Sequence, residues 1–174
     1  MEMKVDLKPL IRFIELLPKN GDLEFSVLKC HLLVEEVLTK LILDSTKHPE
    51  YVRKARLTFA QKVSMARSVS DLEHTTWVWG AVAKLNDARN ELAHGLSVDD
   101  IKAKLEDFIR FVEAEQGAPD PNLITQTFGH FHWAAFKVFG VLSVYAHFDP
   151  TALRIPGAAA RVLLGDAEPH DRSS

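Results

Sequence analysis

Residues 75–95 read TTWVWGAVAKLNDARNELAHG, and this stretch indicates the fold class more clearly than any other. Its apolar residues recur every three or four positions, which is the spacing of one face of an α-helix. They form one stripe: Val78, Ala81, Val82, Leu85, Ala88, Leu92 and Leu96. At about 100° per residue, Asn90 and His94 lie opposite this stripe and one turn apart, and Arg89 lies at its border. We therefore predict an amphipathic helix from Thr75 to His94, ended by Gly95.

Helical periodicity appears along most of the chain, and the alternation typical of strands is nearly absent. We predict further helices over residues 7–17, 22–43, 57–69, 97–116 and 122–148, with Asp22 and Ser97 as N-terminal caps. Residues 44–54, which include Pro49, and residues 117–121 are expected to be loops. Short links between long helices favour antiparallel neighbours. The predicted fold is therefore an all-α, antiparallel bundle of about five to six helices.

A length of 174 residues is enough for one domain with a substantial core. We expect residues 1–150 to form this domain. Residues 151–174 would then be a C-terminal extension, partly a short docked helix over 151–165 and partly a loose tail. The start of the chain has no basic region followed by an apolar run, and no apolar stretch has the length of a membrane span. We expect a cytoplasmic protein without membrane contact.

Charge and cysteine content exclude some function classes. The net charge of −3 argues against a protein that coats DNA regardless of sequence, because such proteins carry a broad basic face. It leaves room for an RNA enzyme with a local basic cleft. The single cysteine, Cys30, cannot form an internal disulfide, and no His/Cys spacing is typical of a zinc site. No metal or other cofactor is predicted.

The predicted helix that begins after Asp22 is apolar nearly all round. Its main stripe contains Leu23, Val27, Cys30, Val34, Val37, Leu38 and Leu41, while Leu28, Leu32 and Leu43 lie on the other side. A helix of this kind is usually buried on more than one side. It is either the central helix of the bundle or packs against a second subunit.

Arg89 is the residue on the 75–94 helix that most needs a partner. A guanidinium at the border of a core is costly to leave unpaired. Glu35 and Glu36, on the long helix, are the candidate partners for an ion pair, and the sequence does not choose between them.

The segment Leu85-Asn-Asp-Ala-Arg-Asn-Glu-Leu-Ala-His-Gly95 resembles the signature of HEPN proteins, in which an arginine precedes a histidine by four to six positions near a helix end. Here the pattern is Arg89-Asn90-x-x-x-His94. The long helix with Leu32-Leu-Val-Glu-Glu-Val-Leu agrees in position and character, so the resemblance covers roughly residues 22–111. It implies a helical bundle that forms a homodimer, with two motifs facing each other. Many family members are metal-independent endoribonucleases, often toxins of toxin–antitoxin or phage-defence systems.

The residue types suit RNA cleavage. Histidine can take or give a proton because its reference pKa is near 6.5, so His94 is the candidate acid or base. The fork of donors on Arg89 matches phosphate oxygens, and Asn90 would orient the ring or contact the phosphate. Because each motif has one histidine, a homodimer would supply both an acid and a base. RNA is then the expected substrate, and an antitoxin or regulatory protein an expected partner.

A structural interpretation of the same residues stays open. A histidine in the last turn of a helix interacts favourably with the negative helix end, and Arg89 could form a purely structural ion pair. The alternative function is a non-catalytic regulator or protein-interaction module, similar to the mannitol-operon repressor family, which also has a helical body.

Other residues are weaker candidates. Adjacent helical residues point about 100° apart, so Cys30 and His31 do not form a nucleophile–base pair, and Cys30 is expected to be a buried thiol. His130 and His132 cannot bind one metal from spacing two on a helix, and they are expected to be partly buried among neighbouring aromatic side chains. The basic cluster Lys47, His48, Arg53, Lys54 and Arg56 is either a phosphate-guiding patch or ordinary loop charge.

Overall fold

The computed structural model describes residues 8–18, 22–70, 75–94, 97–124 and 129–146. These residues form seven helices and no strand: α1 (Lys8–Leu16), α2 (Leu23–Asp44), α3 (Pro49–Lys54), α4 (Phe59–Val69), α5 (Trp77–His94), α6 (Val98–Gln116) and α7 (His130–Ala146). The prediction of an all-α fold is confirmed. The predicted extension over 151–174, its short helix and the Gly95 stop lie outside the described residues.

Local side-chain contacts explain where several helices begin. Asp22 caps α2, because its carboxylate accepts a hydrogen bond from the backbone N–H of Phe25 at 2.9 Å. Thr58 and Gln61 form a reciprocal capping box at the start of α4. The Ser97 hydroxyl accepts from the backbone N–H of Asp100 at the start of α6. The predicted caps at Asp22 and Ser97 are both confirmed.

One predicted loop and one predicted helix start are wrong. Residues 49–54 form helix α3 rather than a loop, because Pro49 occupies its first turn, where a missing N–H and a fixed φ are compatible with a helix. Helix α7 begins at His130 and not near Asn122. Residues 121–123 form a turn instead, and Asp120 accepts hydrogen bonds from the backbone and side-chain amides of Asn122 at 2.8 and 2.9 Å.

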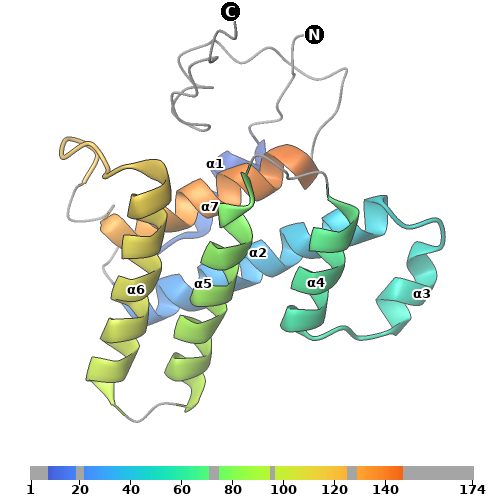
Figure 1. Ribbon diagram of the computed structural model, residues 1–174, viewed down its shortest axis with the longest axis horizontal. Helices are drawn as coiled ribbons and strands as arrows, with labels where there is room; N and C mark the ends of the chain where they lie inside the picture. The colour runs from blue at the N-terminus through green and yellow to red at the C-terminus, as the bar shows by residue number, and fades with distance from the viewer. Residues whose placement is uncertain (1–7, 19–21, 71–74, 95–96, 125–128, 147–174) are drawn as a thin grey trace, which may run out of the picture.

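Helix α2 is the centre of the fold, since it contacts α1, α3, α4, α5 and α7. Figure 1 shows α4, α5 and α6 standing across the direction of α2 and α7, with α5 and α6 side by side as an antiparallel hairpin. This arrangement is compatible with a helical bundle. The described residues form seven helices rather than the predicted five to six, and these lie in two crossing sets rather than in one antiparallel array.

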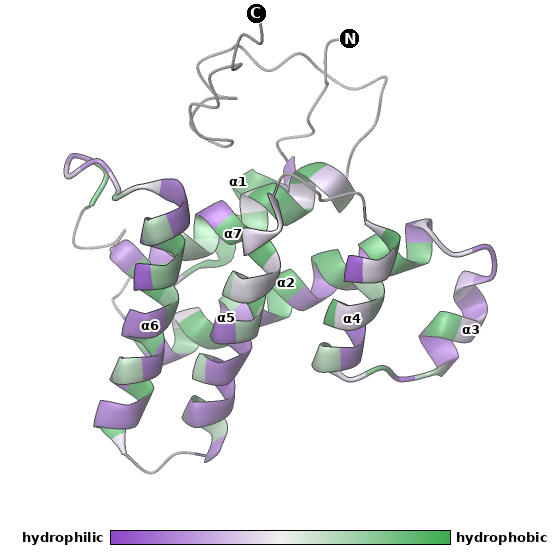
Figure 2. Cartoon of the chain, in the orientation of Figure 1, coloured by the Kyte–Doolittle hydropathy of each residue, from purple (hydrophilic) through white to green (hydrophobic). Residues whose placement is uncertain are grey.

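The hydrophobic core contains buried residues from α1, α2, α4, α5, α6 and α7. Helices α1 and α7 contribute the stacked rings of Phe13 and Phe139, whose centroids are 4.4 Å apart. Figure 2 shows that α7 is mostly apolar while α6 carries polar residues along its outer side. Within the described residues, no helix is long and apolar enough to cross a membrane.

The prediction of apolar residues on several faces of α2 has a divided outcome. The predicted main stripe is buried except at its start: Leu23 is 39% exposed, and the buried residues are Val27, Cys30, Val34, Val37, Leu38 and Leu41. In contrast, Phe25, Leu28 and Leu32 are 46%, 38% and 59% exposed. Helix α2 is thus central on one side and leaves a stripe of apolar side chains uncovered in the single chain.

Candidate active site

Helix α5 places the predicted site residues at different depths. Most of its predicted apolar stripe is buried, with Val78, Ala81, Val82, Leu85 and Ala88 all 0% exposed. Leu92 is half-buried, and Leu96 lies outside the described residues. This burial fixes the rotation of the helix, so Asn90 and His94 face outward and are exposed, while Arg89 is half-buried at the border. His94 is the last residue of α5. Side chains four apart on a helix are neighbours, so Asn90 and His94 share one exposed face.

The guanidinium of Arg89 contacts no carboxylate in the described part of the chain. Its one hydrogen bond runs from Nη1 to Oδ1 of Asn90 at 3.4 Å, which is a weak interaction. No ion pair neutralises this cation, so its charge is available to attract an anion. Partial burial strengthens the attraction, because the protein screens charge less than water does. Arg89 and Asn90 are thus brought together, beside the turn that ends in His94.

Neither glutamate predicted as a partner of Arg89 contacts it. Glu35 binds Lys62 on α4, with Oε1 and Nζ 2.8 Å apart, and Glu36 binds Arg12 on α1, also at 2.8 Å. The side chains of Glu35 and Glu36 leave α2 in different directions because adjacent helical residues are about 100° apart. The predicted ion pair is therefore wrong for both residues in this arrangement.

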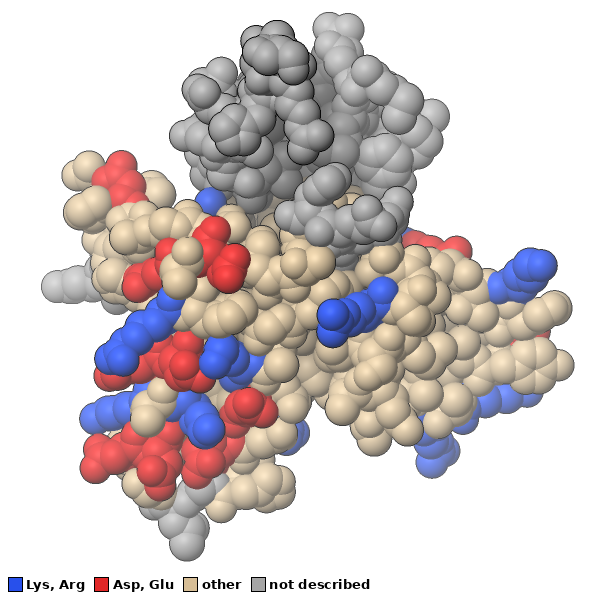
Figure 3. Space-filling view, viewed as in Figure 1, with Lys and Arg blue, Asp and Glu red and all other residues tan. Residues whose placement is uncertain are grey.

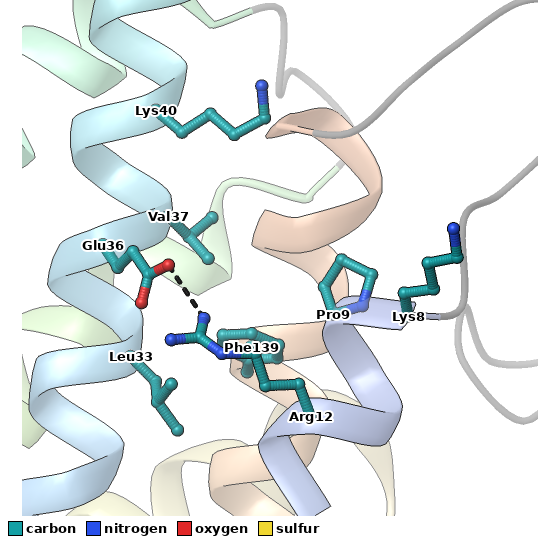
Figure 4. A pocket seen from close by; sticks show the side chains of 8 residues that line it. All are labelled: Lys8, Pro9, Arg12, Leu33, Glu36, Val37, Lys40 and Phe139. Carbon is teal, nitrogen blue, oxygen red and sulfur yellow. Dashed lines mark hydrogen bonds and ion pairs between the residues drawn. The ribbon is translucent and has the colours of Figure 1, made fainter. Parts of the chain in front are cut away.

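The contact of Glu36 with Arg12 lies in a small hollow between α1, α2 and α7. Figure 4 shows the two side chains meeting above the rings and aliphatic groups that form its floor. The hollow has a volume of about 290 Å³ and is lined by Lys8, Pro9, Arg12, Leu33, Glu36, Val37, Lys40 and Phe139. None of the residues of the Arg-Asn-x-x-x-His motif lines it.

His31 is a residue near the motif that the sequence interpretation missed. It is only 6% exposed, and its ring stacks on Phe59 of α4 with centroids 4.1 Å apart. Its Nε2 lies 3.2 Å from Oδ1 of Asn86 on α5. Burial lowers the pKa of His31, an effect opposed by the bond to Asn86 and by Glu35 and reinforced by Arg89. The helical spacing places His31 on the same face as Glu35 and Asn86 on the same face as Arg89, but it does not indicate that these two faces meet.

A groove runs along α2, α3 and α4. It has a volume of about 610 Å³ and is lined by Leu32, Glu35, Glu36, Thr39, Lys40, Leu43, Asp44, Arg53 and Lys62. Of the predicted basic cluster, Arg53 lines this groove, and all five members, Lys47, His48, Arg53, Lys54 and Arg56, are exposed. Figure 3 shows acidic and basic side chains interspersed over α5 and α6, whereas lysine and arginine predominate at α3 and α4.

The weaker candidates have structural explanations. Cys30 is fully buried, and burial raises the pKa of its thiol well above the usual range, so it is not a nucleophile. His132 is 8% exposed, whereas His130 is exposed and its Nδ1 lies 2.8 Å from Oε1 of Glu113. The prediction of partial burial is thus wrong for His130. The described residues contain no group of three or more His, Cys, Asp or Glu side chains that could hold a metal ion.

Comparison of the chain with protein-family models, curated proteins and solved structures finds no match. The HEPN resemblance therefore rests on the motif and its helical setting alone.

Proposed function

We propose that this chain is a metal-independent endoribonuclease of the HEPN type, with an active site shared between two copies. The observation that supports it most directly is the end of α5, where exposed Asn90 and His94 lie beside a half-buried Arg89 that has no carboxylate partner among the described residues. This combination offers a phosphate clamp and a proton-transfer group on one surface.

The proposed reaction is an internal transfer within the RNA. One histidine removes the proton from a ribose 2′-hydroxyl, and the 2′-oxygen forms a bond to the adjacent phosphorus. The bond from phosphorus to the 5′-oxygen of the next nucleotide breaks, and a second histidine donates a proton to that oxygen. Arg89 offsets the negative charge on the phosphate oxygens, and Asn90 orients the substrate or the ring. No metal is needed in this scheme.

The second histidine would come from a second copy of the chain. A two-fold dimer brings the same surface patch of both copies together. The exposed position of His94 is compatible with such a shared site. The uncovered apolar side chains Phe25, Leu28 and Leu32 on α2 supply a surface that association could bury. We propose the toxin of a toxin–antitoxin or phage-defence system as the biological setting.

Cleavage of RNA in excess chelator tests this function. The purified wild-type chain should cleave single-stranded RNA, and His94→Ala should slow cleavage by on the order of 10²- to 10⁴-fold, as expected for loss of a general acid or base. His130→Ala is the matched control, because His130 is also exposed at the end of a helix and lies outside the motif. Undiminished cleavage by His94→Ala would remove this residue from the mechanism.

The second candidate function is a non-catalytic interaction module resembling the mannitol-operon repressor family. The exposed apolar stripe on α2 favours it, because such a surface also suits a different protein partner. Expression in growing cells separates the two functions. An RNA-cleaving enzyme should arrest growth, and Arg89→Ala or His94→Ala should relieve the arrest. An interaction module should be harmless in all three forms.

A further inference from the structure

Positive charge is concentrated around α3 and α4. Residues 47–69 contain six lysine and arginine residues and one acidic residue, Glu50, although the whole chain has a net charge of −3. Helix α6, by contrast, has six acidic residues and three basic ones. Figure 3 shows the same difference on the surface of the molecule. Charge that is distributed in this way creates a local field that attracts anions even to a protein of negative net charge.

Four of these cations lie in or beside α3 and form what we call the α3 patch: Lys47, Arg53, Lys54 and Arg56. All four are exposed, and none of them forms an ion pair within the described part of the chain. Oε1 of Glu50 lies 3.4 Å from Nδ1 of His48 instead. The charge of the α3 patch is therefore available to a partner outside the chain.

Arg53 connects the α3 patch to the groove along α2, α3 and α4. The groove is lined by Arg53, two lysines and three carboxylates. Those lysines and carboxylates are joined in ion pairs, which are Lys62 with Glu35, Lys40 with Asp44, and Glu36 with Arg12. An extended anion that enters the groove would thus meet the unpaired guanidinium of Arg53, whereas each carboxylate there is already bound to a cation.

An exposed aromatic ring accompanies the charges of the α3 patch. Tyr51 is 66% exposed, more than any other large hydrophobic side chain in the described residues. Lys54 follows it by three positions on α3, so the two side chains are neighbours on one face of the helix. A ring in solvent offers a surface on which an unpaired base stacks, and a cation beside it binds the adjacent phosphate.

The backbone at Arg56 is a second unusual feature of the α3 patch. Arg56 has a φ of +48° and is the only residue other than glycine with a positive φ in the described part of the chain. It follows Ala55, the C-cap of α3, at the position that helices usually fill with glycine. A side chain in this conformation is sterically costly. An arginine here therefore indicates a role for its side chain beyond the turn.

We propose that the α3 patch and Tyr51 bind single-stranded RNA, with the cations on phosphates and the ring against an unpaired base. This inference rests on the proposed function and adds a second contact for its substrate, outside the motif. Figure 1 shows α3 and α6 on opposite sides of the molecule. Single-stranded RNA suits this surface better than an acidic protein does, because the exposed ring of Tyr51 matches an unstacked base.

Equilibrium binding of a fluorescent oligouridylate tests the cations, with all variants made in the His94→Ala chain so that the RNA stays intact. Arg53→Gln/Lys54→Gln should lower the slope of log affinity against log salt by about 1.4, which is roughly a 25-fold loss of affinity at about 0.1 M salt. Lys102→Gln/Lys104→Gln is the matched control, because it removes two exposed, unpaired cations from the acidic helix α6. It should stay within about twofold of the parent chain, since salt screens distant charges.

Two single variants test the ring and the strained arginine. Tyr51→Ala should weaken binding of single-stranded RNA by at least about fivefold and leave binding of double-stranded RNA unchanged, because paired bases are already stacked. Tyr51→Phe keeps the ring and should bind as the parent chain does. Arg56→Gly should weaken binding without lowering the melting temperature, because glycine adopts a positive φ readily. Thermal denaturation of each variant measures this.

Three results would overturn the inference. Parental affinity and salt dependence in Arg53→Gln/Lys54→Gln would show that these cations do not contact RNA. An equal loss in the Lys102→Gln/Lys104→Gln control would show that binding responds to total charge alone. Displacement of the RNA by polyglutamate as effectively as by unlabelled RNA of the same charge would assign the α3 patch to an acidic protein partner.

Binding and cleavage together separate this inference from the proposed function. A wild-type chain that binds single-stranded RNA through the α3 patch and does not cleave it supports the inference and rejects the nuclease. Cleavage by the wild-type chain, with parental binding in the Arg53→Gln/Lys54→Gln variant, supports the nuclease and rejects the inference. A wild-type chain that neither binds nor cleaves RNA rejects both.

Discussion

Helices α5 and α7 both carry ionisable residues among apolar ones, but these side chains are mostly buried on α7 and mostly exposed at the end of α5. Nearly every side chain of α7 is buried, and these include His132 and Lys137. Helix α5 buries one stripe and leaves Asn90 and His94 in solvent. The presence of a histidine on a helix therefore says little by itself. The width of the apolar stripe around it decides whether the ring becomes part of the packing or is available for chemistry.

The chemical state of the two histidine environments differs accordingly. His132 lies between helices, with Nε2 at 3.4 Å from Oγ of Ser26, and burial lowers its pKa. Burial also lowers the pKa of Lys137, which lies over the ring of Trp133 at 5.8 Å. These groups belong to the interior of the fold. The residues at the end of α5 are not enclosed in this way, which is why we propose that they carry the chemistry.

The largest expected effect breaks the packing of α7. Phe139 is 2% exposed and stacks on Phe13, so Phe139→Ala should lower the free energy of unfolding by about 3–5 kcal/mol. Asn90→Ala, on the exposed face of α5, should change it by less than about 0.5 kcal/mol. Urea unfolding of both variants measures the difference. Comparable losses would mean that the exposed face of α5 is part of the folded core after all.

The next effect sharpens the role assigned to α5. Arg89→Lys keeps the positive charge but loses the planar fork of donors, so RNA cleavage should fall by about 10- to 100-fold. Arg110→Lys, on the exposed side of α6, is the control, since Arg110 pairs with Glu106 one turn away and lies outside the motif. Full activity of Arg89→Lys would argue that charge alone, and not bidentate contact, matters at this position.

The smallest effect concerns the pH dependence of stability. The pKa values of His31 and His132 are lowered in the folded chain, so the unfolded chain takes up protons first as the pH falls below about 6.5. The stability these two groups contribute is complete above this value and declines as the pH drops through their folded pKa values. Urea unfolding between pH 7.5 and 5 should show this decline. His132→Asn should flatten it, and an equally steep decline would contradict the account.

The sequence predicted the elements of the fold better than their arrangement. Periodicity placed α5 and α6 closely, because each has one clear apolar stripe, and the caps at Asp22 and Ser97 fixed two helix starts. It failed for α3, where a proline that usually breaks helices begins one. Crossing of α4–α6 over α2 could not be predicted, because periodicity gives the face of a helix and not its neighbour.

The candidate site shows the same division. The positions of Arg89, Asn90 and His94 around α5 followed from the helical wheel and agree with their exposure. The ion-pair partner of Arg89 could not be predicted from the sequence, since two adjacent glutamates on α2 were equally good candidates. In the structure Glu35 pairs with Lys62 and Glu36 pairs with Arg12. The positions of α4 and α1 relative to α2 cannot be inferred from the local sequence. His31 was missed because it was considered only with Cys30, and not with Asn86 across the helix contact.

The most direct test of the central claim is the chemistry of the cut RNA ends. In excess chelator, the wild-type chain should leave a 2′,3′-cyclic phosphate and a 5′-hydroxyl. A single deoxyribose at the cleaved position should block the reaction, because the attacking 2′-hydroxyl is then missing. Fragments with 5′-phosphate ends, or cleavage that continues past the deoxyribose, would contradict the assignment of Arg89 and His94 to this reaction.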